Sequence, residues 1–324
     1  MQPFDAVLLI SFGGPQGKAD IRPFLANVLR GRRVSSDRVE EVAHHYELFD
    51  GVSPITERTL EQATGLRDRL HRAGLALPVH VGMRNWHPYL PDTLREMADA
   101  GVRHAIGVIL AAHRSYSSCE QYRRNVEAAQ AEHPLVKVTY VGDWHTHDGF
   151  LDAIASRIIA AQRNLPPPVQ DHARVVFTAH SIPISMARTS PYVTQLRASA
   201  EGVAERLGLR DWALVFQSRS GRPQDPWLEP DICDYLREER SRGLGGVVVC
   251  PLGFVADHVE VLYDLDHEAA AVCQELGIPM QRAAAVNDHP RFIDTLAAAV
   301  EATMRRYADA TPLPLALPPE HSRP

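Results

Sequence analysis

A single histidine, His180, follows an apolar run at residues 175–179 that is typical of a buried strand, and a proline-containing loop comes after it. Ligands of open parallel sheets bind beyond the carboxyl ends of the strands, so the imidazole is expected at the rim where a site would form. Imidazole binds transition metals and gains or loses a proton near neutral pH. A structural hydrogen bond explains one such histidine equally well, so a catalytic role requires a partner.

A row of carboxylates in residues 257–268 supplies that partner. Asp257 is a suitable N-cap for a helix, and Glu260, Asp264 and Glu268 then recur at i, i+4 and i+8 on one face. Like charges at this spacing repel each other, and a solvated outer face is the more common explanation for an arbitrary helix. Because the surrounding positions are mostly apolar, we expect the carboxylates to face an internal cleft.

The pairing of His180 with Glu260 suits the exchange of a metal for protons. One imidazole and one carboxylate can bind Fe(II) transiently, and each can accept a proton if its environment adjusts its pKa. Asp264 and Glu268 would extend a path of oxygen ligands for a hydrated divalent cation. We therefore interpret His180 and Glu260 as the candidate catalytic and metal-binding pair, with the other two carboxylates as a secondary path.

Two further clusters follow predicted strands, at residues 82–89 and at 112–118 together with Tyr122. They mix aromatic rings with arginine and hydroxyl groups, as a pocket for a flat ligand that carries carboxylates would require. Ordinary packing explains each aromatic residue equally well. The glycine turn at 11–15 lacks the full GxGxxG pattern of dinucleotide sites, and its glycines instead permit close approach of a ligand to the backbone.

Short apolar runs alternate with helical patterns along the chain, which is typical of α/β proteins. In each half an apolar strand enters a similar loop, at residues 11–15 and 179–183, so we predict two similar Rossmann-like lobes, each a parallel sheet flanked by helices. The predicted lobes cover residues 1–145 and 146–310, followed by a flexible proline-rich tail at 311–324. The predicted strands lie at residues 7–10, 79–81, 105–110, 136–141, 174–177, 213–216, 246–250 and 279–281.

Composition excludes several classes of protein. The 324 residues are 45% hydrophobic and 23% charged, which is typical of a folded chain. A formal net charge of −6 argues against a nucleic-acid partner. No apolar run reaches the length of a membrane span, and the first residues lack the pattern of a signal peptide, so we expect a cytoplasmic protein and a monomer. The four cysteines form no CxxC pair.

Six motifs, in order along the chain, resemble those of ferrochelatases. The resemblance runs over residues 6–305, and the last two motifs are highly specific together. It implies two Rossmann-like lobes with a porphyrin in the active-site cleft between them. The motifs lie at residues 8–15, 45–46, 51–55, 84–88, 178–183 and 253–260.

The resemblance also implies roles for individual residues. His180 and Glu260 would be the paired metal- and proton-handling residues. Ser53 and Tyr122 match positions that look like porphyrin contacts in the coproporphyrin-using branch, with His45 and Tyr46 as further contributors.

One of these positions departs from part of the family. Phe12 also belongs to the expected porphyrin site, but it stands where some coproporphyrin enzymes have a tyrosine that ligates iron in the product. No such bond is available here. A smaller departure is Asp50, where the family often has glycine before Gly51.

The motifs resemble those of actinobacterial members of the family. Many of these carry a 2Fe–2S cluster held by a cysteine that matches Cys119 and by three more near the C-terminus. Here Cys273 is the last cysteine, so a cluster of that arrangement cannot form. We predict no 2Fe–2S cluster and no permanently bound cofactor, with porphyrin and Fe(II) as substrates.

The expected function is insertion of Fe(II) into a porphyrin, with coproporphyrin III converted to Fe-coproporphyrin III (coproheme) in haem biosynthesis. Protoporphyrin IX is the alternative substrate. Rival interpretations are a cobalt or iron chelatase acting on a sirohydrochlorin-type precursor and a non-catalytic porphyrin-binding protein. In the expected mechanism the cleft bends one pyrrole out of plane, and His180 and Glu260 share ligation and proton removal in an order that the residues do not decide.

Overall fold

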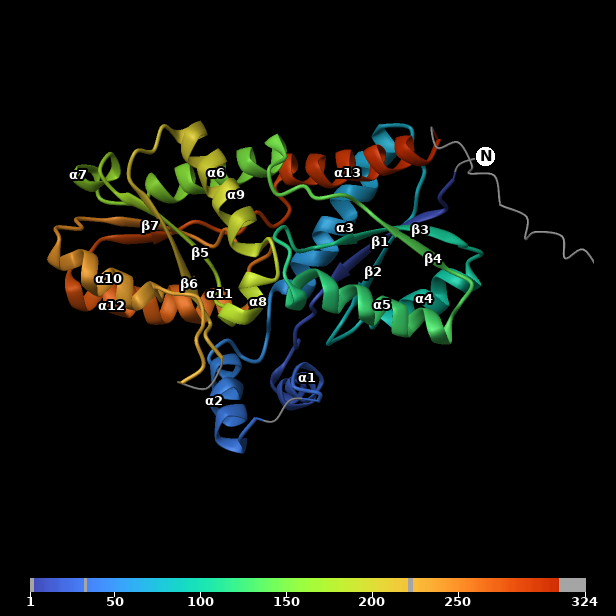
Figure 1. The fold of residues 1–324 in the computed structure, drawn as a ribbon, viewed down its shortest axis with the longest axis horizontal. Helices are drawn as coiled ribbons and strands as arrows, with labels where there is room; N and C mark the ends of the chain where they lie inside the picture. Colours follow the sequence, from blue (N-terminus) through green and yellow to red (C-terminus); the bar gives the residue numbers. More distant parts are fainter. Residues whose placement is uncertain (1–2, 32–33, 221–223, 309–324) are drawn as a thin grey trace, which may run out of the picture.

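Two four-stranded parallel sheets form the framework of the protein (Figure 1). A computed structural model describes residues 3–31, 34–220 and 224–308, so the predicted tail at 311–324 lies outside the described residues. The first sheet has the order β2-β1-β3-β4 and the second the order β6-β5-β7-β8. The strands are β1 Ala6–Ser11, β2 Val79–Met83, β3 His104–Ile109, β4 Lys137–Tyr140, β5 Arg174–His180, β6 Trp212–Gln217, β7 Val247–Cys250 and β8 Met280–Arg282.

Every predicted strand is confirmed, and the two sheets repeat one topology. The central strands are apolar along their length because helices cover both faces of each sheet, as the full burial of β1 and β7 shows. The prediction of two Rossmann-like lobes is therefore confirmed. The helices are α1 Ile21–Val28, α2 Ser36–Glu47, α3 Ile55–Arg72, α4 Leu90–Asp99, α5 Gln121–Glu132, α6 Asp148–Gln162, α7 Pro167–Gln170, α8 Ile184–Arg188, α9 Tyr192–Leu207, α10 Ile232–Ser241, α11 Val259–Val261, α12 Ala270–Leu276 and α13 Pro290–Ala308, with a 3-10 turn η1 Lys18–Asp20 and π-helices η2 Tyr116–Glu120 and η3 Leu262–Ala269.

The last helix joins the two lobes. Helix α13 packs against α3 beside the first sheet and against α6 beside the second (Figure 1). Arg69 of α3 donates from Nε to Asp294 of α13 at 2.7 Å. The division of the chain between residues 145 and 146 remains a prediction, since this helix contacts elements of both halves.

Helices α1 and α2 stand apart from the two sheets, below them in Figure 1. Their apolar faces enclose a small cluster that includes Phe24 and Tyr46, and Val259 of α11 packs into the same cluster. Burial of these side chains holds α1 and α2 against the segment that carries Glu260. Among the described residues, every helix is too short or too polar to traverse a lipid bilayer.

Candidate active site

His180 is the last residue of β5, where it lies opposite Gln217 of β6 in the parallel register. The hydroxyl of Tyr192 donates to the His180 carbonyl at 3.0 Å and so holds the backbone at the strand end. The ring Nδ1 is hydrogen-bonded to the carbonyl oxygen of Ser181. Because a carbonyl only accepts, Nδ1 carries the proton, and Nε2 of the neutral ring keeps its lone pair for a proton or a metal.

Glu260 lies beside His180, as the sequence predicted. Its Oε2 is 3.7 Å from His180 Nε2 and also 3.7 Å from Nε2 of His258. The His180 and Glu260 side chains are 32% and 38% exposed, whereas that of His258 is 13% exposed. Burial tends to raise the pKa of Glu260, but the neighbouring His258 and His180 outweigh it and lower the pKa to about 2. The carboxylate is therefore ionised at neutral pH.

The helix that follows differs from the expected one. It begins at Val259 with His258 at the cap position, so the prediction that Asp257 is its N-cap is wrong. Asp257 instead accepts hydrogen bonds from Arg282, Ala285 and Asn287. After one short turn the helix continues as the π-helix η3, which still carries Asp264 and Glu268. Such π segments are frequent at functional sites.

The carboxylate row leads from the protein interior to its surface. Asp264 accepts hydrogen bonds from the Ser218 hydroxyl and from Nε2 of Gln217, the latter at 3.2 Å. Burial, together with the charges of Glu260 and Glu268, raises the pKa of Asp264 to about 7 despite those bonds. Glu268 is exposed, so the expectation that the whole row faces an internal cleft is wrong for its outer member.

Helix α2 packs against this row. The ring of His45 stacks on Tyr263 of η3 with centroids 3.6 Å apart and planes 11° apart. Tyr46 is buried beside Phe24, with centroids 5.5 Å apart. Burial and the charges of Glu260 and Asp264 raise the pKa of Tyr46 well above its ordinary value. Both predicted residues of α2 therefore lie close to the acidic segment.

The other three predicted contacts belong to the first lobe. Phe12 is half-buried at the end of β1, with its ring centroid 6.1 Å from that of Phe24. Ser53 is buried against the glycine turn, where a Cβ on Gly14 would lie 2.6 Å from the Ser53 Cβ. Tyr122 is buried in the core beside β1 and β3. Burial raises its pKa, and the charge of Glu260 adds to the rise.

A cavity of about 800 Å³ opens along α3. Ser53, Glu57, Glu61 and Asp288 are among its lining residues, and neither His180 nor Glu260 is. Ser53 is therefore the single predicted site residue that this cavity touches.

Comparison with known proteins decides the family. The ferrochelatase family model matches residues 4–304. The chain belongs to the ferrochelatase family. It is accordingly an enzyme, a metal chelatase of the lyase class, and ferrous iron is a substrate of such enzymes.

Several relatives of this ferrochelatase cover most of both chains. The coproporphyrin III ferrochelatase of Streptomyces coelicolor is 46% identical over 310 residues, which is 90% of this chain and 83% of the relative. That of Mycolicibacterium smegmatis is 45% identical and covers 89% and 86%. A protein of Rhodopirellula baltica named ferrochelatase is 44% identical and covers 93% and 86%.

Solved structures agree on the fold. The sirohydrochlorin chelatase SirB of Bacillus subtilis subspecies spizizenii, in complex with cobalt, superposes with a TM-score of 0.57 over 93% of this chain and 95% of that one. At 12% identity the likeness concerns the fold alone.

The four thiols of this ferrochelatase lie in separate elements of the two lobes. Cys119 lies in η2 of the first lobe, whereas Cys233, Cys250 and Cys273 lie in α10, β7 and α12 of the second. Burial raises the pKa of the Cys233 thiol to about 12 and that of the Cys273 thiol to about 11. Among the described residues, no group of three or more His, Cys, Asp or Glu side chains is arranged to hold a metal ion. The absence of a cluster remains a prediction.

Sequence reasoning missed several residues around the carboxylates. His258 lies in the motif that contains Glu260, and its place two residues before Glu260 could have indicated that it belongs to the site. Tyr263 could have been found from its place one turn after Glu260. Gln217 and Ser218 have no local signal, because they lie at and just after the end of β6 and meet Asp264 only through the tertiary packing of η3.

Proposed function

We propose that this ferrochelatase inserts Fe(II) into coproporphyrin III, giving Fe-coproporphyrin III (coproheme), and that His180 and Glu260 are its catalytic pair. The observation that supports the pair is the approach of His180 Nε2 to Glu260 Oε2 at 3.7 Å. A metal ion or a pyrrole N–H could meet a base and a carboxylate there at once. The substrate is supported by the names of the relatives, since the enzymes of Streptomyces coelicolor and Mycolicibacterium smegmatis are coproporphyrin III ferrochelatases.

The two groups would divide the chemistry. Two pyrrole protons leave the porphyrin for each iron that enters. His180 has a free Nε2 lone pair and accepts them in turn, releasing each to solvent from its partly exposed ring. Glu260 is ionised and a poor base, so it serves as an oxygen ligand to the incoming Fe(II).

The remaining predicted residues complete the proposal. Asp264 and Glu268 attract Fe(II) toward Glu260 from the exposed end of η3. Ser53, Tyr122, Phe12, His45 and Tyr46 contribute to the porphyrin site, and Phe12 has no oxygen with which to ligate the iron of the product. The monomeric state, the cytoplasmic location and the lobe boundary after residue 145 are part of the same prediction.

The test is anaerobic metallation by the purified protein with Fe(II), in which coproporphyrin III and protoporphyrin IX are compared by absorbance. Faster insertion into coproporphyrin III is expected. Equal or reversed rates would contradict the proposed substrate and leave the proposed site in place. Insertion into neither porphyrin would contradict the proposed function and favour a sirohydrochlorin-type substrate or a binding protein.

A further inference from the structure

The segment that carries Glu260 has no regular structure before Val259. Strand β7 ends at Cys250, and residues 251–258 connect it to α11. One anchor of this connection is Gly253, whose N–H donates to the Thr178 carbonyl at 3.0 Å and whose missing Cβ would lie 2.7 Å from that of Ala179. The position of Glu260 therefore depends on what holds the rest of the connection, from residue 254 onward.

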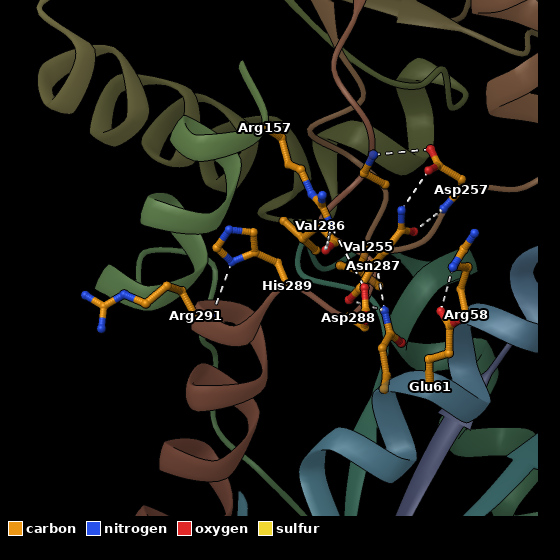
Figure 2. Close-up of polar contacts among 12 residues, drawn as sticks. Arg58, Glu61, Arg157, Val255, Asp257, Val286, Asn287, Asp288, His289 and Arg291 are labelled. Carbon is orange, nitrogen blue, oxygen red and sulfur yellow. Dashed lines mark hydrogen bonds and ion pairs between the residues drawn. The ribbon is translucent and has the colours of Figure 1, made fainter. Parts of the chain in front are cut away.

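Asp257 is held from three sides, and Figure 2 shows its contacts with Asn287. Its Oδ1 accepts from Nη1 of Arg282 at 2.8 Å and from the N–H of Ala285 at 3.2 Å, and its Oδ2 accepts from Nδ2 of Asn287 at 2.7 Å. The Asp257 and Arg282 side chains are only 13% and 14% exposed. Both carboxylate oxygens are thus bonded to the connection between β8 and α13.

Asn287 and Asp257 are hydrogen-bonded to each other in both directions. Its Oδ1 accepts from the N–H of Asp257 at 2.9 Å, and its own N–H donates to the Val255 carbonyl at 3.1 Å. The residue is buried, with a φ of 47° that asparagine tolerates better than most residues. The two connections are therefore joined by a reciprocal set of hydrogen bonds that uses every polar atom of the Asn287 side chain.

Gln62 of α3 bonds both connections from the first lobe. Its side chain is fully buried, and its Nε2 donates to the Val255 carbonyl and to the Asn287 carbonyl, each at 2.9 Å. The two hydrogens of one amide thus bond the same two segments that Asp257 and Asn287 join. Few changes at Gln62 could preserve both bonds without burying a charge, because the amides are the uncharged side chains with two N–H donors on one nitrogen.

We propose that Asp257, Asn287 and Gln62 are positioning residues that set where the Glu260 carboxylate stands relative to His180. The inference rests on the proposed function of that pair. The three residues do not contact the reacting atoms, and they act through the backbone of residues 255–260. A displacement of about 1 Å at a reacting group can cost about 100-fold in rate, so loss of these bonds should affect metal insertion more than porphyrin binding.

The test compares Asp257→Asn with the exchange Asp257→Asn/Asn287→Asp. The single variant places an amide nitrogen where Asn287 Nδ2 needs an acceptor. The exchange restores every donor and acceptor in reversed order, because Asn at 257 then donates to Asp at 287 and still accepts from Arg282 and Ala285. For the single variant we expect kcat for Fe(II) insertion to fall at least about tenfold, and its pH profile to change. The porphyrin Kd, measured by fluorescence quenching, should stay within about twofold of the wild-type value. The exchange should recover most of that loss.

The matched control is Asp266→Asn. Asp266 accepts from Nε of the same Arg282 at 2.7 Å, is 41% exposed and does not bond to the connection before Glu260. Its variant should keep the kcat and the pH profile of the wild type, so a loss in Asp257→Asn alone cannot come from the changed charge around Arg282.

Three outcomes would overturn the inference while wild-type insertion is intact. The first is a folded Asp257→Asn protein with wild-type kcat and pH profile. The second is a folded exchange variant that recovers nothing. If Asp257→Asn does not fold, Gln62→Met replaces it, because methionine removes both donors and keeps the shape of the side chain. The third outcome is a Gln62→Met protein with wild-type kcat and an unchanged pH profile. Absence of insertion by the wild type would instead contradict the proposed function itself.

Discussion

Asp257 and Glu260 belong to one short segment but differ in what surrounds their oxygens. Asp257 accepts three hydrogen bonds at 2.7–3.2 Å from an arginine, a backbone N–H and an amide. Glu260 instead faces two imidazole nitrogens at 3.7 Å, beyond hydrogen-bond distance, and is 38% exposed. Both oxygens of the first carboxylate accept from close donors, and the second carboxylate keeps room for a ligand.

The difference indicates how burial serves each role. A buried carboxylate with close donors is fixed in place and holds the chain around it. A carboxylate that is ionised and whose neighbouring imidazole nitrogens lie 3.7 Å away is not saturated by hydrogen bonds from them, so it can still bind a cation. Asp264 differs from both, because burial, together with the charges of Glu260 and Glu268, raises its pKa to about 7.

The largest expected effect is on the catalytic side of this comparison. His180→Ala should lower the rate of Fe(II) insertion by about 10²- to 10⁴-fold, because it removes the proposed proton acceptor, and it should leave porphyrin binding intact. Stopped-flow absorbance measures the rate and fluorescence quenching the binding. His172→Ala, at an exposed position just before β5, is the control. A near wild-type rate for His180→Ala would contradict the assignment of His180 as the proton acceptor.

For Asp257, the loss of its arginine partner is expected to lower the stability of the fold. Arg282→Met leaves Asp257 without its cation, and breaking a buried ion pair in this way should lower the free energy of unfolding by about 3 kcal/mol. Urea denaturation measures it. The matched change at an exposed pair is Arg95→Met, whose partner Asp92 lies 2.8 Å away with the two side chains 55% and 44% exposed. That change should cost at most about 1 kcal/mol, and equal losses for both would remove the contrast between the two regions.

The titration of Asp264 should make the free energy of unfolding depend on pH. Its pKa is raised from the ordinary 3.8 to about 7, so between these values the folded protein holds a proton that the unfolded chain has released. The contribution of Asp264 to the free energy of unfolding therefore falls as pH rises from about 4 to about 7. Asp264→Asn should thus gain stability relative to the wild type across this range.

Urea midpoints at pH 4.5, 6 and 8 test this expectation. Asp234→Asn removes a carboxylate that is 78% exposed and serves as the control. A stability difference between Asp264→Asn and the wild type that is the same at all three pH values would contradict the stated environment of Asp264.

The smallest effect is expected at the exposed end of the row. Glu268→Gln removes a charge that solvent screens, and an exposed charge contributes about 0.2–1 kcal/mol, so the KM for Fe(II) should rise by no more than about fivefold with kcat unchanged. Steady-state insertion at low ionic strength gives both constants. A fall in kcat would place Glu268 in the chemistry and contradict its role as a screened charge at the exposed end of η3.

The eight strands, the two lobes and the place of His180 at a strand end could be predicted from the sequence. Each is a local property, since a strand buried on both faces needs a continuous apolar run and its carboxyl end follows from its length. The spacing of Glu260, Asp264 and Glu268 likewise indicated a row on one helix face. The helix start was misplaced because Asp257, a good N-cap by type, makes stronger bonds with Arg282 and Asn287 elsewhere.

Tertiary structure alone decided which distant groups meet. His180 and Glu260 are 3.7 Å apart because β5 and β7 are neighbours in the second sheet, and Gln62 reaches residues 193 and 225 positions away along the chain. No local pattern encodes such contacts, since they depend on how helices and sheets pack. By itself the sequence determined the elements and the chemical groups they carry, while packing determined which carboxylate is held fast and which is left open to a ligand.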